Sequence, residues 1–297
     1  MDEARERSSR AAQASRVTLP KAEPEPATVL EFLSARFPRI PDWDLRMARG
    51  LVRAGEHPLP VDAPYRAGLV VTYFREVAEE APVPFEARIL HHDAHLLVAD
   101  KPPFLPVVPA GGFVQETLLA RLQAETGIAD LAPLHRLDRE TAGLVLFSVD
   151  PATRGAYAGL FAGREITKTY EAVAQARTEP AQREWRVENR IEAGEPFFRM
   201  AIVAGPPNAR SDIRLLTWRD DRARFEIRPE TGRKHQIRLH MAAIGHPILH
   251  DRFYPELLPD GPPDFERPLQ LLAKRLAFTD PLSGEPRRFE SEQVLAG

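Results

Sequence analysis

One stretch of this 297-residue chain places a single carboxylate between two guanidinium groups. Asp138 stands between Arg136 and Arg139 and precedes the apolar run 144–147. Positive charges within about 4–6 Å lower the pKa of a carboxyl group and keep it ionised. An ionised carboxylate held beside a reacting carbon can act as a nucleophile or as an electrostatic stabiliser. A structural turn, in which this aspartate binds backbone and arginine, fits the same charge pattern, so the pattern alone leaves both interpretations open.

A second stretch is locally basic. Residues 199–240 contain ten Lys or Arg and five Asp or Glu, in a chain whose formal net charge is −3. We expect a helix that begins near Arg233, on which Lys234 and Arg238 lie four residues apart and share a face. A local excess of positive charge fits contact with a nucleic-acid backbone. A solvated face with local ion pairs fits equally well.

The composition excludes several other kinds of chemistry. The chain has no cysteine, which rules out disulfides, thiolate zinc sites, iron–sulfur clusters and a cysteine nucleophile. Its histidines gather at 91–95 and 235–250 without the spacing of a metal site, so we expect no metal. No apolar run approaches the roughly 18 residues of a membrane helix. The polar start of the chain lacks the features of an export or transit signal, so we expect a cytoplasmic protein with no membrane span.

Short strand patterns and helical patterns follow one another unevenly, which favours an α+β fold. Strands are expected at 89–90, 96–99, 144–147, 170–173, 224–227 and 276–278, and helices at 117–126, 153–163 and 234–244. Asp138 then lies on a turn ahead of a buried strand, and the densest part of the basic stretch lies at the start of a helix.

The chain divides into three expected segments. Residues 1–26 are polar and end in spaced prolines, so we expect a mobile tail. Residues 27–85 are expected to form a small α/β domain with helices near 29–37 and 42–52 and a strand at 69–74. Residues 86–297 form the main domain.

Several stretches, in this order, resemble the motifs of the RNA pseudouridine synthases of the RluA type. They are 89–102, 135–147, 166–170, 231–240 and 245–248, and the resemblance spans roughly residues 86–290. It implies a catalytic domain with a mixed, mostly antiparallel sheet. Residues 28–74 resemble the small alpha-L RNA-binding domain that often precedes such enzymes, although this stretch carries Asp42, Asp44, Glu56 and Asp62. The chain departs from the family at Pro103 and Phe104, where the family usually has Ala-Gly.

The resemblance also implies an activity, the isomerisation of a uridine in structured ribosomal or transfer RNA to pseudouridine. The N1–C1′ bond breaks, the base turns, and C5 joins C1′; the product is an isomer, so no cofactor is needed. By resemblance Asp138 is the catalytic aspartate, Arg238 orients it, and Tyr170 stacks on the uracil and handles a proton. The residues expected to bind RNA are Arg136, Arg139, Arg233, Lys234 and His235.

Two other functions are weighed against this one. A non-catalytic RNA-binding or ribosome-assembly protein on the same fold would need none of Asp138, Tyr170 and Arg238. A carboxylate glycosidase would need two carboxylates about 5–9.5 Å apart, and only Asp138 has a suitable setting. A monomer is expected.

Overall fold

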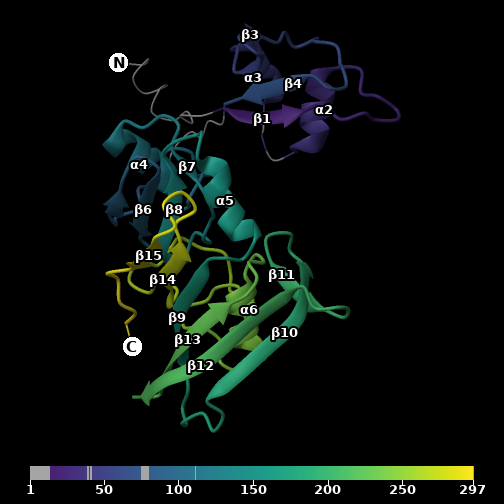
Figure 1. Cartoon of the computed structure of the whole chain (residues 1–297). Helices are drawn as coiled ribbons and strands as arrows, with labels where there is room; N and C mark the ends of the chain where they lie inside the picture. Colours follow the sequence, from purple (N-terminus) through teal and green to yellow (C-terminus); the bar gives the residue numbers. More distant parts are fainter. Residues whose placement is uncertain (1–13, 39, 41, 75–79, 111, 297) are drawn as a thin grey trace. The chain divides into compact units, whose positions relative to one another are not determined.

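Two units, each with its own sheet, make up the described part of the computed structural model, which covers residues 14–38, 40, 42–74, 80–110 and 112–296 (Figure 1). The N-terminal unit comprises Met1–Ala81 and Pro109–Gln115. The large unit comprises Pro82–Val108 and Glu116–Gly297.

The N-terminal unit packs two short helices on a small antiparallel sheet of order β1-β4-β2-β3. Thr28 begins the first helix by accepting a hydrogen bond from the Glu31 backbone N–H, an N-terminal cap. Apolar side chains from both helices and the sheet form its core, among them Val29, Leu33, Trp43, Val52 and Val71. Its elements are β1 (Ser15–Thr18), α2 (Val29–Arg36), α3 (Trp43–Ala48), β2 (Val52–Ala54), β3 (His57–Pro58) and β4 (Val70–Tyr73).

Two expectations for this unit are wrong. The predicted mobile tail is not a tail over residues 14–19, because β1 pairs with β4 along its whole length and Leu19 is buried; residues 1–13 lie outside the described residues. The second helix ends at Ala48 instead of continuing to Val52. Gly50 adopts a left-handed φ of 70°, which ends the helix and lets Val52 begin β2.

The large unit is built on a mixed sheet of order β11-β10-β12-β13-β9-β14-β8-β6-β5, with β15 paired to β14 and β7 to β8. Of the described strand pairs only β14·β8 is parallel, which confirms the predicted α+β fold with a mostly antiparallel sheet. Its strands are β5 (Arg88–His92), β6 (Leu96–Lys101), β7 (Ala132–Pro133), β8 (Ala142–Ser148), β9 (Thr167–Gln175), β10 (Glu184–Ala193), β11 (Met200–Val203), β12 (Ala209–Arg219), β13 (Arg222–Pro229), β14 (Leu271–Thr279) and β15 (Pro286–Glu290). Its helices are α4 (Leu118–Thr126), α5 (Arg154–Ala162) and α6 (Gln236–Ala243).

The long strands β10 and β12 were not expected from the sequence. Charged residues occupy every second position on them, including Arg186, Glu188 and Asp212, and these side chains lie on an exposed face of the sheet. The opposite face packs into the core through residues such as Ile213. Because one face is so strongly charged, the residues of β10 and β12 have the overall composition of a polar loop, and the sequence therefore did not indicate strands there.

The parallel pairing of β8 with β14 depends on Gly143. Its φ of 110° is a left-handed value that side chains rarely adopt. A Cβ at this position would also overlap the backbone of Ala273, lying 2.7 Å from its nitrogen. The glycine therefore lets two strands approach closely at the end of the loop that carries Asp138.

We predict that Gly143→Ala lowers the free energy of unfolding by about 2–4 kcal/mol, because it adds both backbone strain and a steric overlap. Thermal or denaturant unfolding measures the loss. Gly159→Ala in α5 is the matched control: nothing lies within 4 Å of a Cβ built there, so it should be neutral or stabilising by about 0.5–1 kcal/mol. Equal stability of the two variants would contradict the assigned role of Gly143.

Candidate active site

A cavity of about 370 Å³ in the large unit brings the three predicted catalytic residues together. Asp138 comes from the loop between β7 and β8, Tyr170 from β9, and Arg238 from α6. The loop is closed by a turn in which the Thr141 N–H donates to the Asp138 carbonyl. Residues more than 90 positions apart in the chain thus face one space.

Asp138 is held loosely. Its side chain is 22% exposed, and its two carboxylate oxygens lie 3.8 Å from Arg238 Nη1 and 3.9 Å from His235 Nε2. Both distances are too long for hydrogen bonds, and no described side chain or backbone N–H donates one to this carboxylate. Burial raises the pKa of Asp138 above its usual value and outweighs the opposing effect of Arg238. The expectation that the flanking arginines hold this pKa low is therefore wrong.

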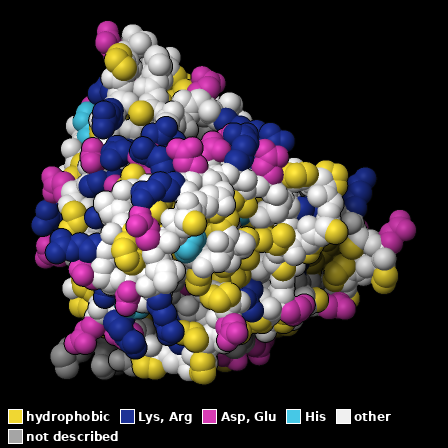
Figure 2. All heavy atoms as spheres, turned by 90° about the horizontal axis from the view of Figure 1, so that it is seen from below, with side chains coloured by type: hydrophobic (Ala, Val, Ile, Leu, Met, Phe, Trp, Pro, Cys, Tyr) yellow, Lys and Arg dark blue, Asp and Glu magenta, His cyan; other side chains and the backbone are white. Residues whose placement is uncertain are grey.

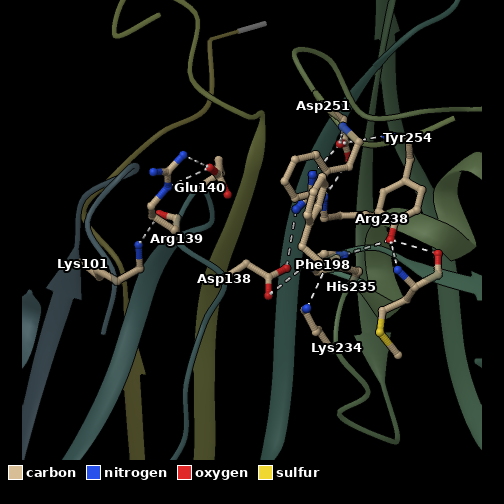
Figure 3. A network of polar contacts seen from close by, with 12 residues as sticks. Lys101, Asp138, Arg139, Glu140, Phe198, Lys234, His235, Arg238, Asp251 and Tyr254 are labelled. Atoms are coloured by element: carbon tan, nitrogen blue, oxygen red, sulfur yellow. Dashed lines mark hydrogen bonds and ion pairs between the residues drawn. The ribbon is translucent and has the colours of Figure 1, made fainter. Parts of the chain in front are cut away.

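Asp251 is the principal partner of Arg238 (Figure 3). Its carboxylate accepts hydrogen bonds from Arg238 Nε, at 2.7 Å, and from Nη2. The same carboxylate accepts from the backbone N–H groups of Phe253 and Tyr254, at 2.8 and 3.1 Å. The resemblance implied only that Arg238 orients Asp138, so Asp251 is a residue that the sequence interpretation missed.

Packing leaves one Arg238 donor directed at the cavity. The guanidinium lies over the rings of Phe253 and Tyr254, 4.8 and 5.4 Å from their centroids, which adds cation–π attraction. Nη1 is buried and has no hydrogen-bond partner within the described structure, although it faces Asp138. An unsatisfied buried donor is costly, so this nitrogen is available to Asp138 or to a bound substrate.

His235 differs from its predicted role. Helix α6 begins at Gln236, so Lys234 and Arg238 do not share a helical face as predicted, and His235 precedes the helix with a left-handed φ of 57°. Its ring is buried, and Nδ1 lies 2.8 Å from the Tyr254 hydroxyl. Burial and the neighbouring cations lower the pKa of His235 to about 3, which keeps the ring neutral. A buried neutral ring does not fit the predicted contact with the RNA backbone.

Lys101, at the end of β6, supports the loop that carries Asp138. Its buried Nζ donates to the carbonyls of Pro102, Leu105 and Arg139, at 2.9, 2.8 and 3.0 Å. Three acceptors match the three donors of an ammonium, although burial lowers the pKa of Lys101 to about 7. The Lys-Pro pair at 101–102 was the sequence signal for this anchor.

Arg139 is not free to bind RNA as predicted. Its guanidinium donates two hydrogen bonds to Glu140, at 2.9 and 2.7 Å, and its side chain does not line the cavity. Glu140 does not line the cavity either, and Asp138 is the one carboxylate among the described residues that do.

Tyr170 lines the cavity from β9. Burial and the nearby Asp138 raise the pKa of its hydroxyl well above the usual value. The hydroxyl therefore stays protonated near neutral pH and can donate a hydrogen bond. Its ring offers a flat apolar surface to a planar ligand.

The predicted basic stretch splits into two kinds of surface. On the sheet several of its arginines are paired: Arg214 and Arg228 pair with Glu226, and Arg224 pairs with Glu171. Figure 2 shows Lys and Arg interspersed with Asp and Glu over one face of the molecule. At the cavity, the predicted RNA-binding residues Arg136, Arg233 and Lys234 make no salt bridge with any described residue. The sheet therefore has the predicted solvated face with local ion pairs, and contact with RNA stays a prediction for the three cavity residues.

Within the described ranges no group of three or more His, Cys, Asp or Glu side chains is arranged to hold a metal ion. None of the described helices combines the length and the hydrophobicity required to cross a bilayer.

Comparison with known proteins identifies the family. Residues 95–243 match the model of the RNA pseudouridylate synthase family. The chain belongs to this family. Dual-specificity RNA pseudouridine synthase RluA of Pasteurella multocida is 34% identical over 205 residues, which cover 66% of this chain and 89% of that protein. Ribosomal large subunit pseudouridine synthase D of Zymomonas mobilis is 32% identical, with 72% of each chain covered.

A solved structure supports the fold. Human RNA Pseudouridylate Synthase Domain Containing 1 superposes with a TM-score of 0.57 at 22% identity, over 72% of this chain and 86% of that one. This RNA pseudouridylate synthase is therefore of the RluA type, an isomerase that converts uridine in RNA to pseudouridine. The predicted family, fold and enzyme class are confirmed.

We predict that substitutions of Arg238 and of Asp251 shift the acid limb of the pH–rate profile in opposite directions. Arg238→Met removes a positive charge beside Asp138, so the pKa of Asp138 rises and the acid limb of the pH–rate profile moves to higher pH. Asp251→Asn leaves the charge of Arg238 uncompensated, so the pKa of Asp138 falls and the acid limb moves to lower pH. Single-turnover rates across pH measure both shifts.

Circular dichroism of both variants controls for folding, because each substitution leaves a buried group without its partner. Acid limbs that stay in place, or that move in the same direction, would show that the Arg238 charge does not set the ionisation of Asp138.

Proposed function

We propose that the enzyme isomerises specific uridines in structured ribosomal or transfer RNA, with Asp138 as the catalytic residue. The observation that carries this proposal is the position of Asp138 as the one described carboxylate lining the cavity, beside an arginine donor with no partner. The name of one relative, a ribosomal large subunit enzyme, supports ribosomal RNA as a substrate, and the name of the other, a dual-specificity RNA enzyme, supports more than one class of substrate. The proposal also places the enzyme in the cytoplasm, as a monomer.

The chemistry requires the target uridine to leave its stack and enter the cavity, at a cost of a few kcal/mol. With C1′ beside it, ionised Asp138 attacks the sugar or stabilises the positive charge that develops there as the N1–C1′ bond breaks. Either route needs the charged carboxylate, which Arg238 supports and orients. After rotation of the base, C5 bonds to C1′, which releases Asp138 where the carboxylate had bonded to the sugar. C5 then loses its proton, and N1, which carried none while it was bonded to C1′, gains one.

Tyr170 has two roles in this proposal. Its ring faces the uracil in the cavity, where stacking holds the base through its rotation. Its protonated hydroxyl donates a hydrogen bond or carries a proton, and its raised pKa excludes a tyrosinate base near neutral pH. Arg136, Arg233 and Lys234 bind the RNA backbone at the mouth of the cavity.

The alternatives fit less well. A glycosidase would need a second carboxylate in the cavity, and Glu140, the nearest candidate along the chain, is bound to Arg139. A non-catalytic RNA-binding protein would gain nothing from a buried Asp251–Arg238 pair aimed at Asp138. Release of tritium from RNA that carries uridine tritiated at C5 separates these functions, because only isomerisation exchanges that position.

We predict that Asp138→Asn abolishes tritium release, with at least a thousandfold loss of rate, while RNA binding stays within about threefold of wild type. The substitution keeps the size of the side chain and removes its charge. Unmodified transcripts of ribosomal and transfer RNA serve as substrates. Turnover near the wild-type rate would exclude Asp138 as the catalytic residue.

We predict that Tyr170→Phe keeps the ring and loses the hydroxyl, so RNA affinity stays near wild type and the single-turnover rate falls roughly tenfold to a hundredfold. Tyr170→Ala should weaken binding as well, because the stacking surface is lost. A Phe variant as fast as wild type would leave the hydroxyl without a role in proton transfer.

A further inference from the structure

A second cavity, of about 440 Å³, opens beside the first one in the large unit. The two share lining residues, including Arg136, Lys168, Tyr170 and Gly232, so they are continuous. The second cavity adds Phe161 and Arg164 from the end of α5. No role proposed above uses either of these residues.

The charges around this second cavity are uncompensated. None of Arg136, Arg164, Lys168 and Arg233 forms a salt bridge with a described residue. Glu230 also lines the cavity, but its carboxylate binds Arg186 at 2.9 Å. Arg214, Arg224 and Arg228 on the sheet strands, in contrast, are paired. The opening of the cavity is therefore lined by positive side chains that no described carboxylate neutralises.

Arg164 itself occupies an unusual position. Its φ is 60°, a left-handed value that favours glycine. The turn is fixed by backbone hydrogen bonds, from the Arg164 N–H to Phe161 and from the Glu165 N–H to Leu160. Arginine here costs conformational energy that glycine would avoid, and its exposed side chain lines the cavity.

Two more cations complete the site. Lys168 Nζ has one long hydrogen bond, 3.4 Å to the Thr231 carbonyl, and burial together with nearby Arg164 lowers its pKa. Arg233 donates from Nε to the Asn208 carbonyl at 3.3 Å, which leaves its terminal nitrogens available. A group with several acceptor oxygens and a negative charge would satisfy all three side chains.

One wall of the cavity is aromatic. The rings of Phe161 and His135 stack with their centroids 4.7 Å apart. His135 Nε2 accepts a hydrogen bond from the Leu146 N–H, and burial lowers its pKa to about 3, so the ring is neutral. A flat neutral wall next to clustered cations suits a sugar and base joined to a phosphate.

We propose that the second cavity binds the nucleotide next to the target uridine in the RNA, with its phosphodiester on Arg164, Lys168 and Arg233 and its nucleoside against Phe161. The inference rests on the proposed function, since it takes the first cavity as the uridine site. Phosphate contacts fix the register of a nucleic acid on a protein. This cavity then determines which nucleotide enters the catalytic pocket.

Binding tests the phosphate site without relying on turnover. The probe is a fluorescein-labelled oligouridylate of eight nucleotides, and the dissociation constant is measured over a range of salt concentrations. Arg164→Gln should weaken binding about threefold to tenfold and reduce the slope of log K against log salt by about 0.7, the value for one phosphate contact on a single strand. Tritium release by the same variant should show a raised KM and a kcat near wild type.

Arg154→Gln is the matched control, because Arg154 begins the helix that Arg164 follows, makes no salt bridge with a described residue and does not line either cavity. It should leave affinity and salt slope unchanged. If Arg164→Gln behaves like Arg154→Gln in both measurements, the phosphate site is refuted. Absence of tritium release by the wild-type enzyme from every RNA tested would refute the proposed function instead, and the binding result would stand by itself.

A double-perturbation cycle, which combines a modified RNA linkage with the Arg164→Gln variant, tests whether the bound nucleotide is the one next to the target uridine. Single neutral methylphosphonate linkages are placed on either side of a uridine that the wild-type enzyme converts. One of them should raise KM at least fivefold for wild type and have little effect for Arg164→Gln, because both changes remove the same contact. Equal effects of every linkage on both proteins would overturn the assignment to the adjacent nucleotide.

Discussion

The buried pair of Arg238 and Asp251 is the constraint on which the catalytic cavity depends. Asp251 takes two donors of the guanidinium and is itself held by backbone N–H groups, so the arginine has one orientation. The third nitrogen is then left to face Asp138. Removing one member of such a pair leaves an uncompensated buried charge, which typically costs about 3–5 kcal/mol. Stability and the electrostatics of catalysis are therefore linked through the same contact.

The sequence predicted much of the large unit because its motifs and apolar strands are local patterns. It brought Asp138, Tyr170 and Arg238 into one site only through the family resemblance, since their proximity depends on the pairing of β9 with β13 and β14. Asp251 was missed because a carboxylate that binds a distant arginine has no local pattern. The strand β1 was missed for the same reason, since its partner β4 lies more than fifty residues later.

Phe104 shows another limit of local patterns. It stands where the family usually has glycine, and it keeps a left-handed φ of 65°. Its buried ring packs on Phe85 and Phe265, with centroids 6.2 and 5.1 Å away. Aromatic packing offsets the strain of the backbone, so the departure preserves the local conformation and adds contacts to the loop that follows Asp251. The sequence showed the substitution but not the cluster that accommodates it.

The unpaired cations at the cavity mouths come from the loop before β8, the turn after α5, the start of β9 and the turn before α6. They gather only when the sheet is complete, so an unfolded chain presents no comparable binding surface. A ligand that binds only the folded state stabilises it by mass action, by about 2.7 kcal/mol at a concentration one hundred times the dissociation constant. RNA bound at the proposed site therefore protects this enzyme from unfolding and from proteolysis of the unfolded state.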